Sequence, residues 1–197
     1  MRHAPPPLLP LLRSPLQGEL LAWLFLHPGS EYSQTELATR FDAPLATVSR
    51  EAGRLAGAGL VHDRRWGNMR LLRANTDTVV SRPLTDLLAV TYGPLPVLSS
   101  LLAPVPGVSE ALIYGSWAAR YSGQPGPVPN DVDVLVIGEA DDDELEEAAR
   151  SAEGMLGRPV HIRRVSQRRW AEAADSFLRT IRSRATANIG LAAPSAA

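Results

Sequence analysis

Apolar residues recur at helical spacing through the first third of the chain. The segment 15–27 predicts a helix that starts at Pro15 and stops before Pro28-Gly29. A capping-box pattern from Ser33 to Glu36 predicts a short helix over residues 35–41. A third helix is expected after Pro44, up to the glycines at 57 and 59. Its apolar face comprises five residues: Leu45, Val48, Ala52, Leu55 and Ala56.

The pattern then changes to that of a hairpin. Residues 60–72 predict two strands joined by a turn at Gly67-Asn68. Helix, helix, helix and hairpin in this order resemble the winged helix-turn-helix of bacterial regulators of the ArsR and MarR type. The resemblance implies a third helix in the DNA major groove and a hairpin wing that contacts phosphates or the minor groove. The implied DNA-binding residues are Thr47, Ser49, Arg50, Arg54, Arg64, Arg65 and Arg70.

Charge supports a polyanionic partner for this region. Residues 40–73 contain seven Arg and three acidic residues, a local balance of +4. The alternative is a winged helix used for protein contacts, with the arginines simply solvated. A single module of this kind binds weakly, so a homodimer on double-stranded DNA is expected.

Helices and short strands alternate in the second half. Two apolar helices are predicted in 79–103, and strands are predicted at 109–114, 132–137 and 160–165. A helix is expected between the last two strands, where the acidic run 141–144 favours a helix start through the helix dipole rather than a metal site. Two more helices are expected near 167–174 and 175–185. Pro and Gly residues fill the long loop before residue 131.

Two motifs in this half suggest phosphate and metal chemistry. Gly115-Ser116 follows one predicted strand, where Gly115 permits a tight turn and Ser116 is expected to cap a helix whose N-terminus would bind an anion. Asp131 and Asp133 open the next strand, and alternation places both on one face, about two rises of ~3.3 Å apart. Such carboxylates repel each other unless a cation intervenes or one is protonated. A nucleoside triphosphate with Mg²⁺ would supply both the anion for the helix N-terminus and the cation for the two carboxylates.

Gly-Ser, a spacer and Asp-x-Asp before an apolar strand resemble the nucleotidyltransferases related to DNA polymerase β, particularly the minimal prokaryotic members. The resemblance implies that Gly115, Ser116 and Arg120 hold the nucleotide and that Asp131 and Asp133 are catalytic and bind Mg²⁺. It also implies transfer of a nucleoside monophosphate to a hydroxyl, in an antitoxin-like protein whose partner is a toxin. The family has a third carboxylate on the third strand, where this chain has His161 and Arg163. Two alternatives stay open: an active transferase, or a catalytically degenerate domain that senses a ligand or binds a protein within a transcription regulator.

Composition excludes several chemistries. The chain has no Cys and no Lys, since all twenty basic residues are Arg, which excludes disulfides, thiolate catalysis, Walker-type phosphate loops and Schiff bases. No apolar stretch reaches the ~18 residues of a membrane span, and the proline-rich N-terminus makes a poor signal peptide. A cytoplasmic protein without a membrane partner is expected. The bias toward Arg, Ala and Pro suggests a bacterium with a GC-rich genome.

The predicted architecture is α+β, with an N-terminal winged helix-turn-helix and a C-terminal nucleotidyltransferase-like domain built on a small mixed sheet flanked by helices. The predicted segments are a flexible arm at 1–13, the winged helix at 14–78, a linker or dimerisation helix at 79–93, the nucleotidyltransferase-like domain at 94–187 and a flexible tail at 188–197.

Overall fold

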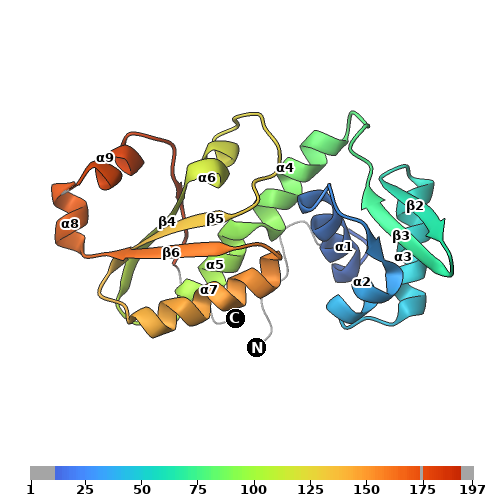
Figure 1. Cartoon of the computed structure of the whole chain (residues 1–197), viewed down its shortest axis with the longest axis horizontal. Coiled ribbons are helices and arrows are strands. Elements are labelled where there is room, and N and C mark those ends of the chain that lie inside the picture. The colour runs from blue at the N-terminus through green and yellow to red at the C-terminus, as the bar shows by residue number, and fades with distance from the viewer. Residues whose placement is uncertain (1–11, 174, 192–197) are drawn as a thin grey trace. The chain divides into compact units, whose positions relative to one another are not determined.

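The computed structural model describes residues 12–173 and 175–191. These residues form an α+β structure, as expected, and they divide into two compact units, Met1–Tyr92 and Gly93–Ala197 (Figure 1). The predicted arm at 1–13 and tail at 188–197 lie largely outside the described residues.

The first unit follows the predicted order of helices and hairpin. Its three strands form an antiparallel sheet in the order β1-β3-β2, and the two-residue turn Gly67-Asn68 joins β2 to β3. The predicted capping box is confirmed, because the Ser33 hydroxyl accepts from the Glu36 amide while the Glu36 carboxylate accepts from the Ser33 amide. The elements are α1 (Pro15–Leu26), β1 (Tyr32–Ser33), α2 (Gln34–Arg40), α3 (Leu45–Gly57), β2 (Val61–Trp66), β3 (Met69–Ala74) and α4 (Ser81–Tyr92).

One apolar core holds this unit together. Helix α1 is buried over most of its length, and α3 contributes Val48, Ala52 and Leu55. Leu45 was expected on the same face, but it is 49% exposed, because it lies in the first turn of α3 at the edge of the core. Helix α4, expected as a linker or dimerisation helix, buries Leu88 in this core, so one side of it belongs to the first unit.

The second unit is a mixed sheet flanked by helices. The strand order is β6-β5-β4-β7, with β5 and β6 parallel and the other pairs antiparallel. The elements are α5 (Pro94–Leu102), β4 (Val108–Tyr114), α6 (Gly115–Tyr121), β5 (Val132–Gly138), α7 (Asp142–Leu156), β6 (Val160–Val165), α8 (Gln167–Glu172), α9 (Ser176–Arg182) and β7 (Ala187–Asn188).

Strand alternation assigns the two faces of this sheet. On β5, Leu135 and Ile137 share one face, where they pack with Leu178 and Ile181 of α9. Asp133 has the same parity and therefore faces the α9 side, at the end of the strand where the apolar cluster stops. The valines between them point to the other face, and β5 is buried throughout apart from Asp133, which is half-buried.

One expectation about the chain is corrected, and one segment meets the length and composition criterion of a membrane span. Residues 188–191 were assigned to a flexible tail, but Asn188 pairs with Leu112 of β4 and Ile189 is buried. The segment Ser81–Leu102 is long and apolar enough to cross a membrane, judged by length and composition alone. This is weak evidence for a membrane, because core helices pass the same test.

Candidate functional site

Helix α3 presents a polar surface on the side away from the core. Arg50 and Arg54 are exposed, whereas Thr47 and Ser49 are half-buried. The Arg50 guanidinium donates to the Thr47 hydroxyl at 3.3 Å, one turn earlier on the helix. Thus all four predicted DNA-binding residues of this helix lie outside its buried stripe, and the two arginines are the exposed ones.

Carboxylates of the same unit pair with three of the predicted DNA-binding arginines. Arg54 pairs with Glu51, whose side chain is buried, and Arg70 pairs with Asp63 on the neighbouring strand. Arg64 binds Glu31 through two nitrogens, and this hydrogen bond lowers the pKa of the Glu31 carboxyl. These pairs reduce the positive charge that the surface offers to an anion.

Arg65 and Arg73 complete the basic surface of the hairpin. Both are exposed, and among the described residues neither has a carboxylate within ion-pair distance. Arg65 stands opposite Arg70 in the register, and Arg73 stands opposite His62. Arg73 was missed from the sequence, although its alternation with the buried Leu72 and Ala74 already places it outside.

The second candidate site lies where β4, β5 and β6 meet. The register aligns Tyr114, Asp133 and His161 across the three strands. Gly115 follows Tyr114 with φ +70°, and a Cβ built on it would lie 2.8 Å from the Asp133 Oδ2. Glycine at this position therefore lets the backbone of one motif approach the carboxylate of the other.

The surroundings of Asp133 disfavour the charged form of its carboxyl group. Burial raises its pKa, and the nearby Asp131 carboxylate raises the pKa further. His161 and Arg163 act in the opposite direction on the pKa of Asp133. Any cation that binds between the two carboxylates would relieve the same repulsion.

The other two predicted nucleotide-binding residues lie on α6. Ser116 was expected to cap a helix, but Tyr114 is the N-cap residue and no side chain makes a capping bond. The helix begins at Gly115, two residues earlier than a cap at Ser116 predicts, so Ser116 lies exposed inside its first turn. The Arg120 guanidinium donates to the Gly126 carbonyl at 2.9 Å and so ties α6 to the Pro/Gly loop.

A single Mg²⁺ fits these residues better than a pair of metal ions. Among residues 12–173 and 175–191, no three His, Asp or Glu side chains are grouped to hold a metal. Asp131 and Asp133 match the one or two carboxylates through which Mg²⁺ ordinarily binds beside substrate phosphates. The position next to Asp133 on β6 holds His161 instead of a carboxylate, and Arg163 lies 5.0 Å above the Phe177 ring.

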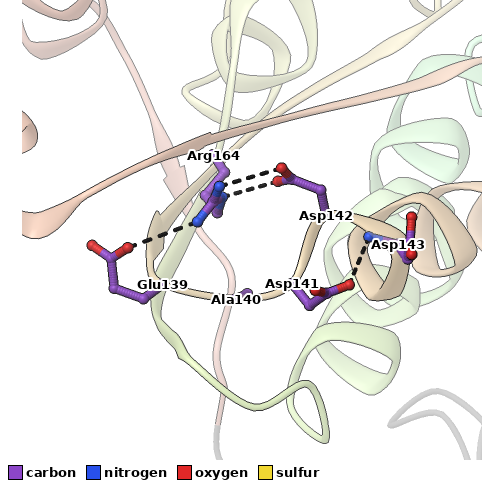
Figure 2. A pocket seen from close by; sticks show the side chains of 6 residues that line it. All are labelled: Glu139, Ala140, Asp141, Asp142, Asp143 and Arg164. Carbon is purple, nitrogen blue, oxygen red and sulfur yellow. Dashed lines mark hydrogen bonds and ion pairs between the residues drawn. The ribbon is translucent and has the colours of Figure 1, made fainter.

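A different acidic group lies beyond the other end of β5 (Figure 2). Asp141 caps α7 by accepting from two amides, and Arg164 binds Asp142 at 2.9 Å and Glu139 at 3.7 Å. The sequence prediction of a charged helix start is confirmed. Each of these three carboxylates has a structural partner in the protein.

Comparison with known proteins adds little. No family model and no curated protein matches the chain. Among solved structures, reduced HlyU from Vibrio cholerae N16961 is similar over 38% of this chain and 74% of that chain, with 20% identity and a TM-score of 0.33. At that TM-score the likeness carries no weight for the fold or the function of this chain.

Proposed function

We propose that the first unit is a winged helix-turn-helix that binds double-stranded DNA, and that the protein is a transcription regulator acting in the bacterial cytoplasm. One observation carries the proposal: α3 and the β2–β3 hairpin follow each other in the order of a recognition helix and its wing, and both turn arginines outward. The local balance of +4 suits a phosphate backbone.

Arg50 and Arg65 are the arginines best suited to contact DNA. Three other arginines of this surface, Arg54, Arg64 and Arg70, form ion pairs with carboxylates. In the described contacts, Arg50 bonds only a hydroxyl and Arg65 has no ion pair. Arg50 would approach base edges or phosphates in the major groove, and Arg65 would meet phosphates beside the wing. Two copies on two half-sites, about one helical turn apart, would supply the affinity that one unit lacks.

The test is duplex binding by fluorescence anisotropy. The full chain should bind a 30-base-pair duplex at low salt, and Arg50→Ala or Arg65→Ala should weaken binding by roughly 5- to 160-fold, about 1–3 kcal/mol. Arg168→Ala is a matched control, because Arg168 is an exposed arginine of the second unit with no described ion pair. Equal affinity for all four proteins would refute DNA binding by this surface.

We propose a second function for the other unit: binding of a nucleoside triphosphate with one Mg²⁺, without efficient transfer. The favouring observation is the approach of Gly115 to the Asp133 carboxylate, next to a second carboxylate at Asp131. Where a transferase of the resembled family needs a third carboxylate, His161 and Arg163 offer positive or neutral groups. They could bind phosphate oxygens but would not replace that metal ligand.

Calorimetry with ATP and Mg²⁺ separates the alternatives. Binding that disappears in Asp133→Asn, without release of pyrophosphate, supports a ligand-sensing domain. Pyrophosphate release that depends on Asp131 and Asp133 would instead establish an active transferase, and modification of a co-expressed toxin-like protein would identify its acceptor. Absence of nucleotide binding by the unmodified protein would exclude both readings and leave a protein-interaction domain.

A further inference from the structure

The tip of the β2–β3 hairpin carries an apolar pair that the core does not use. Trp66 and Met69 are the last cross-strand pair before the turn, and they are 62% and 46% exposed. Gly67, with φ +57°, closes the turn between them. Directly opposite residues share one face of a hairpin, so the indole and the thioether lie side by side at its end.

We propose that Trp66 and Met69 form a wedge that enters the minor groove of duplex DNA and bends the duplex. The inference rests on the proposed DNA binding and names a contact within it. Apolar side chains inserted between base steps partly unstack them and kink the duplex by about 20–90°. Side chains at the narrow tip of a hairpin can reach into the minor groove, which is about 6 Å wide.

The surroundings of the pair favour a nucleic acid over a protein partner. On the same face of the hairpin lie Arg64 and Arg73, and Arg65 lies next to Trp66 on the other face. The other exposed side chain of that face is the polar His62, Leu71 is buried, and Arg64 keeps its pair with Glu31, so Arg73 is the cation there without a described ion pair. A stable protein interface needs about 800 Å² on each partner, whereas one aromatic side chain buries only about 150–250 Å². An apolar tip framed by arginines complements a groove framed by phosphates.

The choice of base step follows from the energetics of the kink. Pyrimidine–purine steps such as TA unstack most easily, whereas A-tracts are stiff. Two 30-base-pair duplexes that differ only in a central TATATA or AAAAAA segment therefore serve as probes. Donor and acceptor dyes at their ends report the bend, and 19F spectra of protein labelled with 5-fluorotryptophan report the indole, with the Trp66 signal assigned by its loss in Trp66→Phe.

The expected results distinguish the role of Trp66 in bending the duplex from the role of Arg65 in binding its phosphates. The unmodified full chain should raise energy transfer more on the TATATA duplex and shift the Trp66 signal. Trp66→Ala should abolish the bend and weaken binding several-fold with an unchanged salt dependence, because no cation is lost. Trp66→Phe should restore part of the bend. Arg65→Ala should lower the salt dependence while the bound duplex stays bent.

Three outcomes would overturn the wedge. In the first, Trp66→Ala binds and bends DNA like the unmodified protein, so DNA binding stands and the wedge fails. In the second, Trp66→Ala changes the sedimentation mass but not the bend, so the tip joins copies of the chain. In the third, the unmodified protein binds neither duplex, and the proposed function fails with the inference. Circular dichroism confirms that each variant is folded, which is expected because the tip contributes nothing to the core.

Discussion

The arginines of the first unit and the paired aspartates of the second show two ways in which a protein carries charge. Arg50 and Arg65 are exposed to solvent, where a charge costs little and its presence alone reveals little. Asp133 is half-buried beside Asp131, and both burial and repulsion raise its pKa. A cation bound beside such a carboxylate would offset part of this cost, whereas a surface arginine becomes informative only through its position on α3 or the hairpin.

The largest effect is expected where the backbone approaches the carboxylate. Gly115→Ala should destabilise the second unit, by about 1–2 kcal/mol from the left-handed backbone and by about 1–3 kcal/mol more from overpacking against the Asp133 carboxylate. Gly123→Ala is the matched control, because its φ is also positive, +86°, but nothing lies within 4 Å of the added Cβ. Urea unfolding measures both. Equal losses would mean that Gly115 serves only the turn.

A smaller effect of opposite sign is expected from Asp133→Asn. Since the pKa of Asp133 is raised in the folded state, the charged form destabilises the fold above that pKa, and the variant should be more stable at pH 7. The gain should be below about 1 kcal/mol, because solvent screens a partly exposed group. It should vanish as the pH falls below about 3.9, the ordinary pKa of Asp.

Thermal unfolding from pH 3 to pH 8 tests the sign. Asp142→Asn is the control, because it removes an exposed carboxylate that binds Arg164 and should slightly destabilise the protein. Mg²⁺ with ATP should raise the melting temperature of the unmodified protein and leave that of Asp133→Asn unchanged. A variant less stable than the parent at pH 7 would show that Asp133 already has an adequate partner in the protein.

The smallest effect concerns the ion pair that competes with DNA for Arg64. Glu31→Gln should release the guanidinium and tighten duplex binding by up to about fivefold at low salt, which is the 0.2–1 kcal/mol of an exposed pair. Asp77→Asn removes the same charge from an exposed residue that makes no described ion pair. Anisotropy titrations of the two variants should differ. Identical gains would indicate that only net charge matters.

Local patterns in the sequence predicted most elements, because each depends on neighbours along the chain. The capping box at Ser33, the Gly67-Asn68 turn and the acidic start of α7 are examples. The helix start at Gly115 was misplaced, because a left-handed glycine can serve either as the turn or as the first helical residue, and Ser116 follows it in both cases.

Long-range contacts were beyond prediction. Nothing in the local sequence indicates that Glu31 binds Arg64, 33 residues away. The alignment of Asp133 with His161 depends on β5 and β6 being parallel neighbours, which only the folded sheet determines. The DNA-binding role of the α3 and hairpin residues and the nucleotide-binding role of the residues around Asp133 stay predictions.

The most direct measurement is the salt dependence of duplex binding by the full chain. When log Kd is plotted against log salt concentration between about 50 and 200 mM, the unmodified protein should give a straight line. Its slope should correspond to several phosphate contacts. Arg50→Ala and Arg65→Ala should each reduce the slope by about one, and Arg168→Ala should leave it unchanged. A Kd that does not respond to salt, or one slope shared by all four proteins, would contradict a DNA-binding surface on α3 and the hairpin.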